Sequence, residues 1–247
     1  MTTKISGIIV NKQDYQLVDA IVNIYTINGI IAIYCPGVRK ITSKNQAFLQ
    51  LFNYCEFELF FAYSKNKMHR LKTGVILETF PNIHSNYERL MVTNYLVKLY
   101  SELSEDTNII FNELLVILQT INSDKNEVKK LFCFLTFKVL KLLGLQLQLN
   151  HCSICKSNKN IKTINWSAGG FVCRGCFKNE QQIFPISLLQ ALYELNHEPE
   201  FEQWEINQDD LYVLIPFYYE YLSERGVLSY QSLKPIKEKW ILSSLFK

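Results

Sequence analysis

Four of the chain's seven cysteines stand in two closely spaced pairs. Two residues separate Cys152 from Cys155, two separate Cys173 from Cys176, and seventeen residues lie between the pairs. Two intervening residues let one tight turn aim both sulfurs at a single ion, and a hairpin can return the second pair to complete a tetrahedron. The spacing therefore predicts a four-thiolate zinc site.

A zinc ion held by four cysteines has no open coordination position, so the predicted site is structural rather than catalytic. Metal binding would stabilise a module at about residues 150–180, which is too short to form a hydrophobic core of its own. A disulfide pair or a degenerate site is the alternative interpretation.

The N-terminus lacks the charged-then-apolar layout of a signal peptide, and no apolar run approaches the roughly 20 residues that span a bilayer. We therefore expect a cytoplasmic protein with no membrane partner. Thiols stay reduced there, which favours metal binding over disulfides. Cys35, Cys55 and Cys133 stand singly among apolar neighbours and are predicted to be buried.

A second group of residues suggests nucleic-acid binding. Cations cluster in one predicted loop and around the next turn: Arg39, Lys40, Lys44, Lys65, Lys67, Arg70 and Lys72. Small β-barrels grip single strands with cations along the backbone and aromatic side chains stacked on bases. Tyr25, Tyr34 and Tyr63 are candidate stacking platforms, although strand aromatics more often lie in the core, and loop cations are often only solvated.

Net charge is only +3, but its distribution is uneven. Residues 1–80 carry nine Lys and Arg against five Asp and Glu, and residues 183–233 carry one Arg against nine acids. The basic block could attract phosphate, and the acidic block could be a solvated face.

The first eighty residues are predicted to form a β-domain. Asn28-Gly29 between apolar runs is a strong hairpin signal, and Phe57 to Tyr63 alternate with period two. The predicted strands cover residues 5–10, 19–26, 30–34, 57–63 and 71–80. Five short strands with a basic insertion indicate an OB-like barrel, with an SH3-like barrel as the alternative.

Beyond residue 80 the apolar period becomes helical. The predicted helices cover residues 85–103, 109–121, 124–144, 185–197 and 209–225, with Ser85, Asn86 and Asp124 as candidate N-caps and Gly144 and Gly226 as stops. The expected fold class is α+β: an OB-like domain at 1–80 and a helical domain at 81–247 that contains the zinc module.

No common catalytic motif is present. The sequence lacks a Walker A loop, G-x-G-x-x-G, G-x-S-x-G and H-E-x-x-H, as well as the zinc deaminase signature. His197 to Glu200 could suggest a metal site, but Pro199 argues against the helix it would need. A non-enzymatic role is expected.

Three stretches resemble the bacterial RecO family. They are Thr26 to Gly29 with Gly37-Val38-Arg39-Lys40 and Ser43-Lys44; Lys138 to Leu149 leading into Cys152; and Gly169 to Cys176. The resemblance implies a DNA repair and recombination factor that binds single- and double-stranded DNA and anneals complementary strands.

The same resemblance implies protein partners. With RecR, such a factor would help load RecA onto DNA coated by single-strand-binding protein, whose acidic C-terminal tail it would bind, in the nucleoid. Arg39, Lys40 and Lys44 carry over as DNA contacts and the four cysteines as zinc ligands. For the tail, Lys129, Lys130 and Lys138 are the candidates.

Three other interpretations stay open. An RNA-binding or ribosome-associated OB/zinc protein would carry the same residues, since an OB groove accepts either nucleic acid. A protein scaffold would bind no oligonucleotide, and an enzyme would turn one over.

Overall fold

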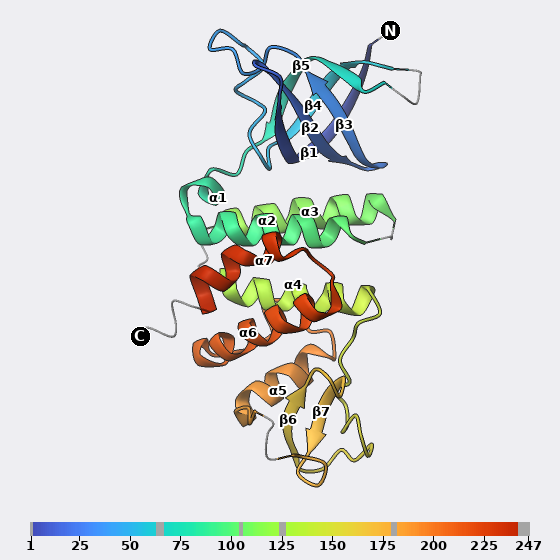
Figure 1. Cartoon of the computed structure of the whole chain (residues 1–247), viewed down its shortest axis with the longest axis vertical. Helices are drawn as coiled ribbons and strands as arrows, with labels where there is room; N and C mark the ends of the chain where they lie inside the picture. The colour runs from blue at the N-terminus through green and yellow to red at the C-terminus, as the bar shows by residue number, and fades with distance from the viewer. Residues whose placement is uncertain (1, 63–66, 104–105, 124–126, 179–181, 242–247) are drawn as a thin grey trace. The chain divides into compact units, whose positions relative to one another are not determined.

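The computed structural model describes residues 2–62, 67–103, 106–123, 127–178 and 182–241, except for the side chain of Tyr230. The chain forms two compact units, and Figure 1 shows their elements. The first comprises Met1–Thr93 and Ser104–Lys125, and the second comprises Asn94–Leu103 and Asn126–Lys247.

The first unit contains a closed five-stranded barrel with the strand order β1-β2-β3-β5-β4. Its strands are β1 (Thr2–Tyr15), β2 (Asp19–Thr26), β3 (Gly29–Cys35), β4 (Tyr54–Phe60) and β5 (His69–Glu78). The long β1 pairs with both β2 and β4, and β3 pairs in parallel with β5. This is the OB arrangement, so the OB-like prediction is confirmed over the SH3-like alternative.

The barrel encloses one apolar core, to which the segment between β3 and β4 contributes. Val38, Phe48 and Leu49 of that segment are buried with the inward residues of the strands. Phe48 meets Phe57 of β4 edge to face, with 6.1 Å between the ring centroids, a spacing typical of such pairs. The predicted basic insertion is therefore anchored in the core and not a free loop.

The predicted Asn-Gly hairpin joins β2 to β3. Gly29 has a φ of 101°, which favours glycine, and Thr26 pairs with it across the turn. The Thr26 hydroxyl donates to the Gly29 carbonyl at 2.8 Å and accepts from the Asn28 N–H at 3.1 Å. Hydrogen bonds between neighbouring residues thus stabilise this turn.

Two strand predictions need correction. The alternation assigned to residues 57–63 ends earlier, because β4 stops at Phe60 and Phe61 is 42% exposed; Tyr63 lies outside the described residues. The last strand is shifted from 71–80 to His69–Glu78, since Pro81 begins a short helix.

Helices complete the first unit. They are α1 (Pro81–Ser85), the beginning of α2 (Tyr87–Ser101) and α3 (Thr107–Asn122). The Thr107 hydroxyl donates to the Ile27 carbonyl at 2.7 Å, so the first turn of α3 is tied to the β2–β3 hairpin. Asn86 caps α2 by accepting from the Arg89 N–H, as predicted.

The second unit is built on α4 (Val128–Leu142), α6 (Gln208–Arg225) and the end of α2. Tyr95 of α2 packs against Phe132 of α4, which contacts Trp240 edge to face. The unit also holds α5 (Ile186–Leu195), α7 (Tyr230–Ile236), a π-helix at Lys237–Ile241, and the hairpin β6 (Ile161–Asn165) and β7 (Gly170–Cys173). Figure 1 shows this hairpin beside α5.

The predicted stops of two helices are confirmed. Gly144 and Gly226 adopt left-handed φ values of 70° and 64°, and the residue after each donates back to the last helical turn. The predicted cap Asp124 lies outside the described residues. The fold class α+β is confirmed, and the domain boundary after residue 80 stays a prediction.

The packing of Phe48 over β5 can be tested with Gly74→Ala. A Cβ at Gly74 would lie 2.7 Å and 2.9 Å from ring atoms of Phe48 and 3.1 Å from the Glu56 carbonyl. Overpacking of this kind costs about 1–3 kcal/mol, so we expect a lower midpoint of urea unfolding for the barrel. Thr73→Ala, at the exposed neighbouring position, is the control and should change it little. Adding Phe48→Leu should restore part of the loss; no recovery would contradict the packing.

Candidate metal centre and nucleic-acid interface

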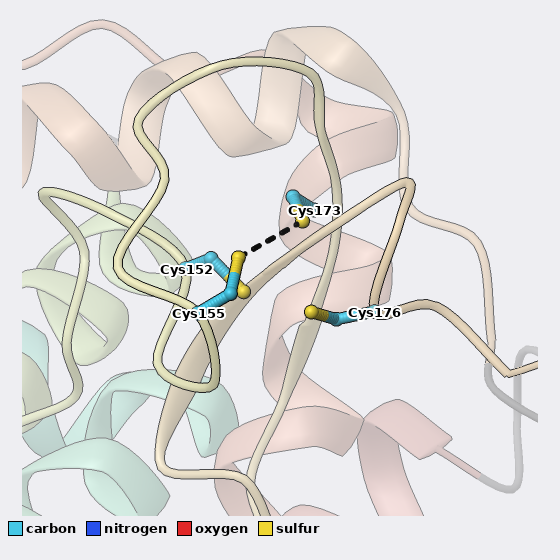
Figure 2. A group of neighbouring side chains, drawn as sticks. All are labelled: Cys152, Cys155, Cys173 and Cys176. Atoms are coloured by element: carbon cyan, nitrogen blue, oxygen red, sulfur yellow. Dashed lines mark hydrogen bonds between the residues drawn. The ribbon is translucent and has the colours of Figure 1, made fainter.

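The four cysteines predicted as ligands lie together at one end of the β6–β7 hairpin. The sulfurs of Cys152, Cys155, Cys173 and Cys176 all lie within 4.8 Å of one another, and those of Cys155 and Cys173 are 3.5 Å apart. Figure 2 shows the side chains converging from two turns. Zn–S bonds of 2.3 Å in a tetrahedron separate sulfurs by about 3.8 Å, so the cluster fits a structural metal.

Backbone hydrogen bonds shape both turns. The Lys156 N–H donates to the Cys152 carbonyl and the Cys176 N–H to the Cys173 carbonyl, each at 3.0 Å. The Ser153 N–H donates to the Phe171 carbonyl at 2.8 Å, which ties the first turn to β7. Backbone hydrogen bonds therefore hold the two C-x-x-C segments in position independently of a metal ion.

The thiols interact strongly. Burial acts to raise the pKa of Cys152, but N–H groups of Cys155, Cys173 and Ile154 bond to its sulfur and lower the pKa to about 6. The pKa of Cys176 is raised to about 12, mainly by its hydrogen bond with Cys155. One thiolate is favoured and the last is opposed by its neighbours, so a central cation is needed to stabilise four together.

Gly170 joins the hairpin to the segment after α4. Its φ is 151°, and a Cβ there would lie 2.2 Å from the Gln148 carbonyl oxygen. The Phe171 N–H donates to that carbonyl and the Gln148 N–H donates to Gly169. Glycine is required because the two backbones touch.

The structure divides the predicted DNA-binding cations. Arg39 and Lys72 are engaged within the barrel: Arg39 contacts Asp14 at 3.0 Å, and Lys72 contacts Glu58 at 2.7 Å. The other described members are exposed and show no ion pair within the described part of the chain: Lys40, Lys44, Lys67 and Arg70. Lys65 lies outside the described residues.

Strand register places one band of outward side chains across the barrel. Tyr34 of β3 pairs with Ile21 of β2 and with Arg70 of β5, and Arg70 pairs with Phe60 of β4. Residues opposite one another on neighbouring strands project from the same face. We call Ile21, Tyr34, Arg70 and Phe60 the outer row; it places a cation between two aromatic rings.

The aromatic predictions had mixed outcomes. Tyr25 is only 3% exposed and cannot stack on a base, because α3 packs against this end of β2. Tyr34 is half-buried and lies on the outer row. Tyr15 and Phe60 are further candidates that the sequence pattern does not single out, and both side chains are more than 40% exposed. The Tyr15 ring meets the Tyr34 ring edge to face, with 6.0 Å between the centroids. The pairing of β3 with β5, which places Tyr34 next to Arg70 and so in line with Phe60, is a long-range contact that no local sequence signal indicates.

The three lysines considered for an acidic tail differ on α4. Lys129 lies 4.7 Å from the ring centre of Tyr212, and Lys138 is exposed. Lys130 lies over Phe201 and lines a pocket with the carboxylates of Glu127, Glu194, Glu205 and Asp210. Those four acids do not favour an acidic peptide beside Lys130.

Among the described residues, no helix combines the length and apolarity that crossing a bilayer requires.

Two family models match the chain, one for each part. Residues 1–80 match "Recombination protein O N terminal" and residues 84–231 match "Recombination protein O C terminal". The chain is 26% identical over 231 residues to the DNA repair protein RecO of Mycoplasma mycoides subsp. mycoides SC, covering 91% of this chain and 92% of the relative.

Two other relatives carry the same name and match most of the chain. The DNA repair protein RecO of Listeria monocytogenes serotype 4b (strain F2365) is 25% identical, covering 96% of this chain and 95% of its own length. That of Mycoplasma capricolum is 29% identical over 72% of this chain and 73% of its own.

The metal centre predicts a specific loss in Cys173→Ser. We expect wild type to bind one divalent ion per chain and the variant to lose it, because three thiolates and a hydroxyl form a much weaker site. Elemental analysis of the purified protein, with thiol titration, measures this. Cys133→Ala, a buried cysteine outside the cluster, should keep the metal. Equal metal content in all three proteins would contradict the assignment.

Proposed function

Because the chain belongs to the RecO family of DNA repair proteins, we propose that it binds single- and double-stranded DNA and anneals complementary strands. With RecR it would also help load RecA onto DNA coated by single-strand-binding protein. Its setting would be the cytoplasm, in association with the nucleoid.

The observation that carries the proposal is the outer row on an OB barrel. Arg70 lies between Tyr34 and Phe60, and the exposed Lys40 and Lys44 belong to the segment that follows β3. OB barrels bind oligonucleotides on the face of strands 2 and 3 and the adjoining loops. Cations would follow the phosphates while aromatic rings stack on bases.

Ion pairs across β1, β4 and β5 explain why Lys4 and Lys72 are not among the proposed contacts. Lys4 is bonded to Glu56 and Lys72 to Glu58, both at 2.7 Å. A face whose cations are neutralised by neighbouring carboxylates attracts phosphate weakly. Of the cations predicted from sequence, the proposed DNA contacts are thus Lys40, Lys44, Lys67 and Arg70. Lys65, which lies outside the described residues, is proposed as a contact from the sequence alone.

Annealing requires no bond chemistry. A cationic surface that holds two strands lowers their mutual repulsion and raises their local concentration. The ordinary base pairing of the strands then completes the reaction. A non-enzymatic role is therefore sufficient for the proposed activity.

Zinc is the proposed metal. Four thiolates in a tetrahedral set suit Zn²⁺, and with no open position the ion would hold the two turns together. Its role would be to stabilise the β6–β7 hairpin, which is small and supports the neighbouring α5.

The protein partners are proposed from family membership. RecR, RecA and the tail of single-strand-binding protein would act with this chain as they do with the family. For the acidic tail, the exposed Lys138 is a better candidate than Lys130, whose pocket is lined by four carboxylates.

The proposal predicts that a triple variant, Lys40→Ala with Lys44→Ala and Arg70→Ala, binds single-stranded DNA more weakly and anneals more slowly. Each lost phosphate contact lowers the salt slope of single-strand binding by about 0.7, so the slope should fall by about 2. Fluorescence anisotropy across a salt series and annealing of naked and protein-coated oligonucleotides measure both effects.

The control removes three exposed lysines that have no proposed role in binding: Lys98→Ala, Lys159→Ala and Lys234→Ala. Its net charge equals that of the test variant, so it should bind nearly as wild type does. Equal losses in the two variants would show that general charge matters and not this face. Tighter binding of matched RNA than of DNA would favour the alternative of an RNA-binding protein.

A further inference from the structure

A buried carboxylate lies beside the proposed nucleic-acid face. Asp19, the first residue of β2, is 7% exposed. Its Oδ2 accepts from the Tyr34 hydroxyl at 2.5 Å, and its Oδ1 accepts from the Gly37 N–H at 2.7 Å. One side chain thereby connects the outer row to the start of the segment that carries Lys40.

A second set of bonds joins the same two segments. The Arg39 N–H donates to the Val18 carbonyl at 2.9 Å, and its guanidinium donates to the carbonyls of Gln16 and Leu17 at 3.3 Å. The guanidinium also pairs with Asp14 at 3.0 Å. Arg39 is thus directed at the β1–β2 turn rather than at solvent alone.

Gly37 gives the segment the shape these bonds need. Its φ of 63° turns the chain immediately after Pro36, and its N–H then reaches the Asp19 carboxylate. The connected segments are the β1–β2 turn, the end of β3 and residues 37–40. We call this arrangement the clasp.

The charge of Asp19 is unfavourable for DNA binding as such. The Tyr34 hydroxyl, then the Gly37 N–H, lower its pKa against the effect of burial, and Lys40 and Arg70 lie near enough to lower it further. The carboxylate is therefore ionised at neutral pH and partly offsets the two cations proposed to contact phosphate. A negative charge there needs a reason other than attraction of DNA.

We propose that Asp19 is a positioning residue for nucleic-acid binding. By holding the Tyr34 hydroxyl and the Gly37 N–H together, it orients the Tyr34 ring and presents Lys40 beside Arg70 as one surface. Arg39 secures the other side of the clasp and contributes through the β1–β2 turn rather than by direct contact with phosphate. This inference rests on the proposed function.

The test uses Asp19→Ala, for which a charge effect and a positioning role predict opposite changes in DNA affinity. If Asp19 acted only through its charge, Asp19→Ala would tighten DNA binding and steepen its salt dependence. The positioning role predicts about tenfold weaker binding of a single-stranded oligonucleotide, equivalent to about 1.4 kcal/mol. It also predicts a salt slope lower by about 0.7 to 1.4, because one or two phosphate contacts are lost although net charge rises.

Two further variants separate positioning from general damage. Tyr34→Phe keeps the ring and the net charge and removes only the hydroxyl; it should weaken binding in the same direction, by less. Glu56→Ala removes the β4 carboxylate that pairs with Lys4 and is not part of the clasp, and its binding should equal or exceed that of wild type. Circular dichroism confirms that each variant is folded.

The results distinguish a failure of the positioning role from a failure of the proposed function. If wild type binds and the triple variant is impaired, but Asp19→Ala or Tyr34→Phe binds as tightly as wild type or tighter, the positioning role is wrong and the proposed function stands. If wild type binds no oligonucleotide in dilute buffer, both are wrong. Weaker binding with a lower slope in Asp19→Ala, a smaller loss in Tyr34→Phe and none in Glu56→Ala support the inference.

Discussion

The parallel pairing of β3 with β5 is the contact on which the first unit depends. Only two residue pairs form it, Ile33 with His69 and Tyr34 with Arg70, whereas the other strand pairs of the barrel are longer and antiparallel. This short contact closes the sheet into a barrel and encloses the core. It also brings a tyrosine and an arginine, distant in sequence, next to each other on the outer surface.

Local chemistry explains which features could be predicted from sequence. The cysteine spacing, the Asn28-Gly29 turn and the stops at Gly144 and Gly226 each depend on residues close together in the chain, and the structure places them as expected. The helix α7 was missed because Pro235 interrupts its apolar pattern. The barrel was recognisable from strand count, but its strand order depends on long-range pairing.

The candidate interface shows where sequence reasoning stops. A basic run marks a surface without indicating which cations are already engaged, so Arg39 and Lys72 were grouped with Lys40 and Arg70. Ion pairs to Asp14 and Glu58 distinguish them, and both acids belong to strands that only the folded barrel brings near. Tyr25 failed as a stacking candidate because α3 covers that end of β2.

The close approach of Gly170 to Gln148 has a consequence for how the second unit folds. Backbone hydrogen bonds across this contact make the hairpin with the cysteines continuous with the chain leaving α4. An appended finger on a flexible tether could melt alone and leave the helices intact. Here the free energy of ion binding would instead be transmitted through main-chain hydrogen bonds to the helical bundle, so metal occupancy and the cooperativity of that unit would be thermodynamically linked.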